Sequence, residues 1–139
     1  MDQILEFLRS VPAFYVATVD EDNRPRVRPF SLVYEWDGKL SFGTNDTKKV
    51  YRQLEKNPHV EICAFQPENG KWMRIFGKVE MFKSVETNRR IFETMPSLKE
   101  MYGNENNPMI VAFSFVEGRA DIYSFASDSS EPVESISLQ

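Results

Sequence analysis

Short runs of apolar residues, many of them alternating with polar ones, dominate the chain and are separated by turn signals. Such runs are typical of β-strands, and they predict strands over residues 13–19, 26–36, 39–43, 59–65, 71–82, 109–116 and 119–125. Asp37-Gly38 is a hairpin signal, and Glu117-Gly118 is expected to close a last hairpin. The pattern therefore predicts six to seven antiparallel strands.

Apolar residues at helical spacing predict a few helices among these strands. They are expected over residues 2–9, 47–56 and 84–95, with a further turn over 97–102. Ser84 is the expected N-cap of the helix that follows it. Many strands with few helices predict a mainly β fold, a β-barrel with flanking helices.

The length of the chain, 139 residues, is typical of one domain with its own core. No repeat and no composition shift divides residues 1–126, which we predict to be that single domain. Residues 127–139 are rich in Ser and Glu and are expected to form a flexible C-terminal tail.

Composition and charge disfavour several classes of function. A net charge of −4 argues against nucleic acid as the main partner, because phosphate backbones require a broad basic surface. No apolar run approaches the length of a membrane span, and the first residues lack the features of a signal peptide, so a cytoplasmic protein is expected. The single cysteine, Cys63, and the single histidine, His59, supply neither an internal disulfide nor a metal-ligand set.

Two predicted strands, residues 26–36 and 71–82, carry apolar side chains on both faces. In residues 71–82, Met73 and Ile75 share one face, while Trp72 and Phe76 share the other. A half-exposed antiparallel strand alternates between apolar and polar residues, so the second face is expected to be covered as well. In a chain of this size a second copy is the simplest cover, and we predict a homodimer.

A local basic cluster stands out in this acidic chain. Arg28 and Thr44 precede the predicted helix 47–56, and Lys48 and Lys49 lie in its first turn. A helix start offers unpaired N–H groups and a positive dipole end, so cations there are unfavourable unless an anion binds. We interpret the cluster as a phosphate site; the simpler alternative is that both lysines are solvated surface residues.

The order of these features resembles the FMN-binding split barrel related to pyridoxamine 5′-phosphate oxidase. The features are Arg28-Pro29, the Asp37-Gly38 hairpin, Thr44, Lys48-Lys49 before a helix, Asn57-Pro58 after it, and the strand from Trp72 to Gly77. The resemblance extends over residues 5–125 and is closest to the short members grouped with nitroimidazole reductases. It implies FMN as the cofactor.

The resemblance also implies which residues contact FMN. Arg28 corresponds to a strand arginine that contacts the FMN phosphate or ribityl chain, and Lys49 to a phosphate-binding position at the helix start, with Lys48 beside it. Trp72 and Arg74 lie on the strand that reaches the flavin from the facing subunit. The full implied set is Arg28, Pro29, Phe30, Ser31, Gly43, Thr44, Lys48, Lys49, Trp72 and Arg74. No catalytic residue follows from the resemblance, because the flavin itself carries the redox chemistry.

The expected function is therefore that of an FMN-dependent oxidoreductase, with a small-molecule electron donor and acceptor and the flavin bound at a homodimer interface. Residues 124–139 lack the aromatic and arginine residues that hold pyridoxal phosphate in the oxidases, so that substrate is not expected. Three alternatives remain open at this point: a flavin-binding protein without turnover, the same fold with a deazaflavin or haem, and a dimeric barrel without a cofactor.

Overall fold

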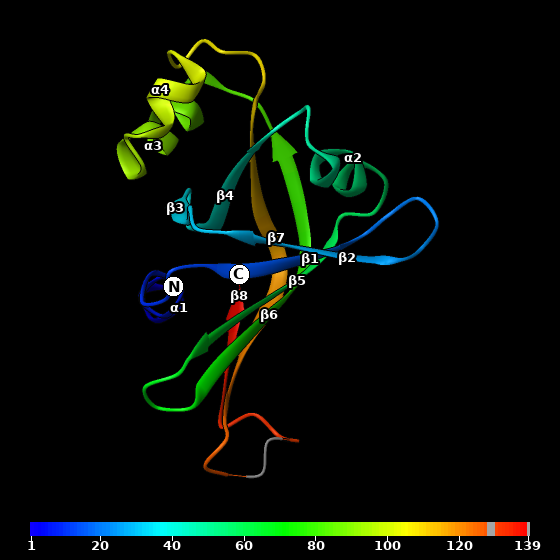
Figure 1. Ribbon diagram of the computed structural model, residues 1–139, viewed down its shortest axis with the longest axis vertical. Helices are drawn as coiled ribbons and strands as arrows, with labels where there is room; N and C mark the ends of the chain where they lie inside the picture. Colours follow the sequence, from blue (N-terminus) through cyan, green and yellow to red (C-terminus); the bar gives the residue numbers. More distant parts are fainter. Residues whose placement is uncertain (128–129, 139) are drawn as a thin grey trace.

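One antiparallel sheet of eight strands forms the body of the protein in the computed structural model, which describes residues 1–127 and 130–138 (Figure 1). The strand order is β2-β1-β5-β6-β7-β4-β3, and β8 pairs with β7 beside this path. Among the described residues β2 and β3 do not pair with each other, so the barrel is split. The predicted mainly β split barrel with flanking helices is confirmed, with eight strands instead of six to seven.

The strands are β1 Phe14–Val19, β2 Pro25–Phe30, β3 Tyr34–Trp36, β4 Lys39–Asn45, β5 His59–Gln66, β6 Lys71–Phe82, β7 Ile110–Ser124 and β8 Glu134–Leu138. The helices are α1 Asp2–Arg9, α2 Lys49–Lys56, α3 Val85–Thr94 and α4 Leu98–Tyr102. No helix in the described part of the chain is long and apolar enough to cross a membrane.

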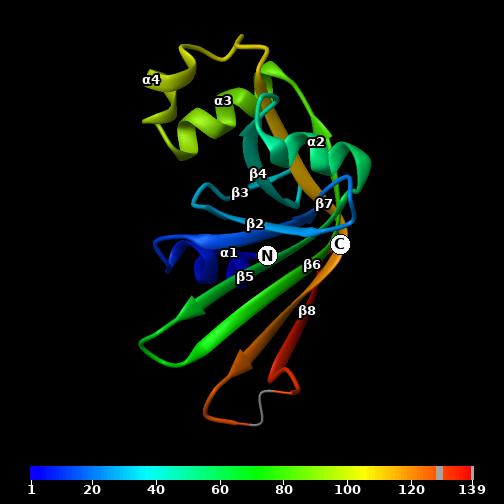
Figure 2. The ribbon, with the colours of Figure 1, turned by 45° about the vertical axis from the view of Figure 1, so that its right-hand side comes forward.

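Apolar side chains from both halves of the sheet meet inside the barrel. The rings of Phe14 and Phe42 lie 5.8 Å apart, and those of Phe42 and Phe113 lie 5.1 Å apart. The helix α1 adds Ile4 and Leu8 to this core. A second, smaller cluster joins α3 to the segment after β2, to β3 and to the start of β7, and it consists of Leu32, Tyr34, Ile91, Phe92, Ile110 and Ala112. This second cluster fixes α3 over one end of the sheet (Figure 2). Residues at that end line the cavity described below.

The strand predicted over residues 26–36 is divided in the structure. β2 ends at Phe30 and β3 begins at Tyr34, and these two strands lie at opposite ends of the sheet order. Residues 31–33 carry the chain from one end to the other, and Leu32 and Val33 are buried on the way. The apolar pattern continued through the crossing because the crossing segment is also buried.

The hairpin predicted around Glu117-Gly118 is wrong, because β7 continues through these residues. Its register against β6 passes from Lys78–Glu117 to Val79–Phe115, which leaves one extra residue on β7 as a bulge. Gly118 lies opposite Gly77, and a Cβ on Gly77 would stand 2.1 Å from the Glu117 carbonyl oxygen. The glycines therefore permit close approach of two strands rather than a chain reversal.

The interpretation of residues 127–139 as a tail needs correction for its last part. Glu134–Leu138 form β8, which pairs with β7 from Gly118 to Ile122, and Leu138 is buried in the barrel core. The apolar residues Ile136 and Leu138 alternate with serines, a pattern that the polar composition of the segment obscured. The expected mobility of the remainder stays a prediction, and residues 128–129 and 139 lie outside the described residues.

The helices agree closely with the sequence pattern. The helix α1 has the predicted bounds, and the Ser84 hydroxyl accepts a hydrogen bond from the Thr87 N–H at 3.1 Å, which confirms Ser84 as the N-cap of α3. The helix α2 begins two residues later than predicted, with Lys48 as its N-cap residue and no side-chain cap. Instead, the Asn45 side-chain oxygen accepts hydrogen bonds from Thr47 just before the helix.

Candidate functional site

A cavity of about 450 Å³ lies between β2, β4, the start of α2 and the pair α3–α4. The structure brings eight of the ten predicted cofactor residues to its wall: Arg28, Pro29, Phe30, Ser31, Gly43, Thr44, Lys48 and Lys49. These residues come from three separate segments, which the crossing from β2 to β3 and the β4–α2 connection place side by side. Their role in binding FMN stays a prediction.

One end of this cavity is strongly cationic. Arg26, Arg28, Lys48 and Lys49 line it, and none of the described acidic residues contributes to the wall. In a chain with a net charge of −4 this is a local reversal of sign. An anion entering the cavity meets attraction from several charges in a partly desolvated space, where electrostatic interactions are stronger than in water.

The Arg28 guanidinium is held in place by neutral groups alone. Its Nη1 donates to the Thr18 hydroxyl at 2.7 Å and to the Val16 carbonyl at 3.2 Å, and its Nη2 donates to Gln53 Oε1 at 2.8 Å. Thr18 also donates to the same Gln53 oxygen, which closes a small network. Burial lowers the pKa of Arg28 below its ordinary value, yet an arginine remains protonated at neutral pH. A fixed positive charge that has no carboxylate partner in the described part of the chain thus lines the cavity.

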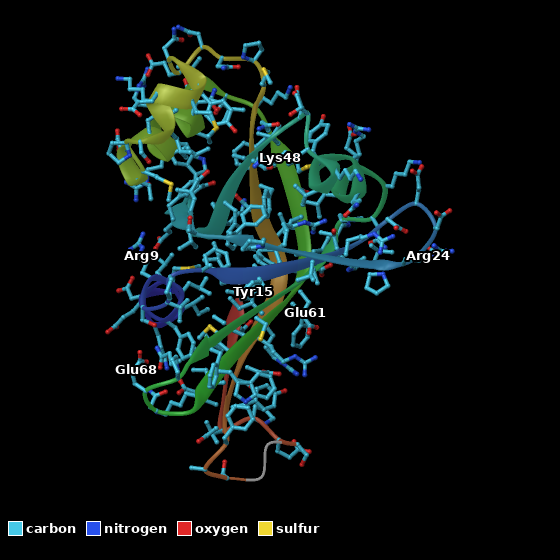
Figure 3. The ribbon with its side chains drawn as sticks, viewed as in Figure 1. Arg9, Tyr15, Arg24, Lys48, Glu61 and Glu68 are labelled. Atoms are coloured by element: carbon cyan, nitrogen blue, oxygen red, sulfur yellow. The ribbon has the colours of Figure 1, made fainter. Side chains whose placement is uncertain are left out.

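The start of α2 adds a second set of cationic groups. Lys48 and Lys49 make no ion pair within the described residues, and the first turn of α2 contains no acidic residue. Figure 3 shows Lys48 at this helix start. The nearest carboxylate in sequence, Asp46, is paired with Lys83 at 2.7 Å and does not line the cavity. The hydrogen bond from Lys83 to Asp46 also raises the pKa of Lys83. The negative charge of Asp46 is therefore compensated by Lys83, and it does not act against an anion in the cavity.

The side chain of Thr44 carries a buried hydroxyl on the cavity wall. Its Oγ1 has no hydrogen-bond partner among the described residues, and the residue is only 7% exposed. Buried hydroxyls are almost always hydrogen-bonded, because leaving one unpaired is unfavourable by about 1–3 kcal/mol. A ligand atom that forms a hydrogen bond with the Thr44 hydroxyl would therefore remove this unfavourable free energy.

The other end of the cavity is apolar and was not identified from the sequence. Its wall is formed by Leu32, Ile91, Met95, Leu98, Met101, Tyr102 and Ile110. The Tyr102 hydroxyl accepts a hydrogen bond from Asn45 Nδ2 at 2.7 Å, which joins α4 to the end of β4. The apolar residues of α3 and α4 were visible in the sequence, but helical spacing alone does not separate a cavity wall from ordinary core. Gln53 was also missed, and no sequence signal marks it.

Trp72 and Arg74 lie outside this cavity, on the opposite face of β6 from the barrel core. The Trp72 indole stacks on the Tyr123 ring with centroids 4.2 Å apart, and Arg74 pairs with Glu61 at 3.0 Å. Tyr15 and Glu61, labelled in Figure 3, lie on the neighbouring strands β1 and β5, well away from Lys48. Within one chain these two residues therefore do not join the other eight, and their predicted reach into a second subunit stays a prediction.

Comparisons with known proteins agree with this architecture. A family model described as pyridoxamine 5′-phosphate oxidase matches residues 1–124. A pyridoxine/pyridoxamine 5′-phosphate oxidase from Deinococcus deserti is 32% identical over 101 residues, which are 73% of this chain and 47% of that protein. The chain thus spans less than half the length of this curated relative.

Two solved structures show the same fold over nearly the whole chain. A NimC/NimA family protein from Clostridium acetobutylicum is 38% identical and has a TM-score of 0.87, with 99% of this chain and 93% of that chain covered. A pyridoxamine 5′-phosphate oxidase-related, FMN-binding protein from Nostoc punctiforme is 15% identical and has a TM-score of 0.63, covering 99% and 94%. The resemblance inferred from the sequence is confirmed, and the chain belongs to the pyridoxamine 5′-phosphate oxidase family.

Proposed function

We propose that this protein is an FMN-binding oxidoreductase that holds the flavin phosphate at the cationic end of the cavity. The observation that carries the proposal is a cavity to which the described residues contribute four cations and no acidic side chain, beside a buried Thr44 hydroxyl without a partner among them. A phosphate monoester matches these groups, because its oxygens accept charge-assisted hydrogen bonds from Arg and Lys and a further bond from a hydroxyl.

The remaining parts of FMN fit the rest of the cavity. Its flat, largely apolar ring suits the wall formed by Pro29, Phe30, Ser31 and Gly43, with the apolar end of the cavity beyond them. At Gly43 a Cβ would stand 2.9 Å from Ile91 Cδ1, so a larger residue there would narrow the wall. When bound, the flavin supplies the electron transfer. The protein's own residues bind its phosphate, orient its ring and exclude water.

We further propose that two copies of the chain assemble through the outer face of the sheet. Tyr15 and Phe125 on this face are 52% and 65% exposed, and Trp72 Nε1 is buried without a partner among the described residues. Exposed aromatic residues beside charged pairs such as Arg74–Glu61 are typical of a protein interface. A second copy would place Trp72 and Arg74 of each subunit near the flavin of the other.

The substrate is proposed only as a small molecule that exchanges electrons with the flavin. The described residues bring no carboxylate and no histidine to the cavity wall that could act as an acid–base pair. A flavin-binding protein without turnover would show the same affinity for FMN but no faster reduction of bound FMN by nicotinamide donors than of free FMN.

The first test of the proposed FMN site is spectroscopic. The protein is saturated with FMN, freed of excess flavin, and compared with Lys49→Ala and Arg28→Ala by absorption and by FMN titration. Loss of one charge-assisted contact predicts FMN binding weaker by about tenfold or more in Lys49→Ala. Lys99→Ala is the matched control, since Lys99 is an exposed helix cation that does not line the cavity.

The outcomes separate the alternatives. Retained flavin absorption that is lost in Lys49→Ala but not in Lys99→Ala supports the proposed site. Equal FMN affinity in all variants removes Lys49 and Arg28 from it. A haem-type absorption band would change the ligand, although His59, the chain's single histidine, lies outside the cavity wall. Absence of any bound chromophore after FMN addition would refute the flavoprotein proposal.

A further inference from the structure

A second cavity, of about 460 Å³, adjoins the first between α2 and the turn that joins β1 to β2. Figure 1 and Figure 2 both show this turn beside α2. Arg26, Lys49 and Gln53 line both cavities. These shared residues belong to the cationic end of the first cavity, so the two spaces meet at the proposed phosphate position.

The walls of the second cavity carry charges of both signs. Two cations there are already paired: Arg26 with Asp20 at 3.1 Å, and Lys56 with Glu21 at 3.4 Å. Arg52 has no ion pair within the described part of the chain, and its guanidinium donates only to the Thr47 carbonyl, at 3.5 Å. Arg52 follows Lys49 by one helical turn, so the two cations lie on the same side of α2.

We propose that the second cavity binds a group esterified to the flavin phosphate, so that this chain accepts a dinucleotide, FAD, as well as FMN. This inference rests on the proposed function, because it assumes that the flavin phosphate lies at the shared residues. Arg52 then binds the second phosphate. The nucleoside lies along α2, where Asp22 and Glu55 on the cavity wall accept hydrogen bonds from ribose hydroxyls.

The acidic residues decide between FAD and a flavin with a different extension. An extension that carries several carboxylates beyond the phosphodiester, as in a glutamate-bearing deazaflavin, would meet four acidic side chains in this cavity: Asp20, Glu21, Asp22 and Glu55. Like charges at close range repel; the FAD extension brings one such charge, its second phosphate, which Arg52 offsets, while its ribose and adenine are uncharged and present hydroxyl and amino donors. The mixed charges therefore favour a nucleotide extension.

The test compares three ligands on the same protein. Riboflavin, FMN and FAD are titrated calorimetrically into flavin-free wild type, Arg52→Ala and Lys99→Ala. We expect FAD to bind wild type at least as tightly as FMN. Arg52→Ala should weaken FAD by about tenfold, as for the loss of one charge-assisted contact, and leave FMN within about threefold. Lys99→Ala, which removes the same charge from another helix, should change neither.

Two results would overturn the inference while leaving the FMN site intact. FAD binding tenfold weaker than FMN in wild type would show that the phosphate end is closed to a further group. Equal losses of FAD and FMN affinity in Arg52→Ala would show that Arg52 acts on the first phosphate or only through its long-range electrostatic attraction. Failure of FMN and FAD alike would instead refute the proposed function, and this inference with it.

Discussion

Thr44→Val should make the flavin-free protein more stable and at the same time weaken FMN binding. The Thr44 hydroxyl is buried on the cavity wall without a partner among the described residues. Valine has nearly the same shape and no hydroxyl, so the substitution removes an unfavourable buried polar group and leaves no large void. A rise in stability together with a loss of FMN affinity distinguishes a ligand-binding hydroxyl from a structural one, whose removal would lower stability.

The magnitude follows from the state of that hydroxyl. A buried, unpaired polar group is unfavourable by about 1–3 kcal/mol, so the free energy of unfolding should rise by about 1 kcal/mol, the lower end of that range. For a domain of this size that is about 3 °C in the melting temperature. Loss of one neutral hydrogen bond to the ligand should weaken FMN binding by about threefold to tenfold.

The control is Thr18→Val, at another buried threonine near the same cavity. The Thr18 hydroxyl accepts from Arg28 and donates to Gln53, so its removal leaves partners unsatisfied and should lower the free energy of unfolding by about 1–2 kcal/mol. Urea unfolding of flavin-free protein at one protein concentration, with FMN titration alongside, measures both effects. If Thr44→Val lowers stability and leaves FMN affinity unchanged, the hydroxyl has a protein partner and the reasoning fails.

Three further predictions concern the barrel. Gly77→Ala should destabilise the protein by more than about 3 kcal/mol, because a Cβ at Gly77 would stand 2.1 Å from the Glu117 carbonyl oxygen; folded yield and urea unfolding report this, and a near-neutral effect would contradict the close approach of β6 and β7. Leu138→Ala should lower the free energy of unfolding by about 2–4 kcal/mol, because Leu138 packs in the barrel core; a loss under 1 kcal/mol in urea unfolding would mean that β8 does not contribute. Burial raises the pKa of the Tyr34 hydroxyl well above its ordinary value, so the unfolded chain loses this proton first as the pH rises. The contribution of Tyr34 is therefore complete below about pH 10 and falls by up to 1.4 kcal/mol per pH unit above it, a slope that Tyr34→Phe should remove.

The fold was predictable from the sequence where local pattern and long-range pairing agree. The amphipathic helix α1 and the cap at Ser84 depend only on neighbouring residues, and both were predicted correctly. The errors arose where the same local pattern serves two structures. Glu117-Gly118 is typical of a turn, but Gly118 lies opposite Gly77, a contact between residues far apart in the chain. Likewise, β8 is fixed by its pairing with β7, which composition does not reveal.

The site was predictable in its charges but not in its apolar wall. Cations in the first turn of a helix oppose the helix dipole, so Lys48 and Lys49 were unusual enough to indicate a ligand. The apolar residues Met95, Leu98 and Met101 carry no such signal, because the same spacing describes an ordinary packed helix. Arg28 was predicted from the sequence to bind an anion, and it lines the cavity, whereas Gln53, which orients it, could be found only from the distances in the structure.

The features that identify the site are unfavourable for the flavin-free chain, which connects its stability to its function. The uncompensated lysines at the start of α2, the Arg28 guanidinium held by neutral groups and the unpaired Thr44 hydroxyl each oppose folding to a small extent. A bound phosphate ester reverses the sign of all three at once, because it supplies the negative charge and the acceptors that they lack. Binding to the folded state alone raises its stability by mass action, so the largest stabilisation by FMN is expected in wild type and smaller ones where any of these groups is removed. A ligand without phosphate, such as riboflavin, meets none of these unsatisfied groups, and its failure to stabilise the protein would locate the energetic centre of the site at the start of α2.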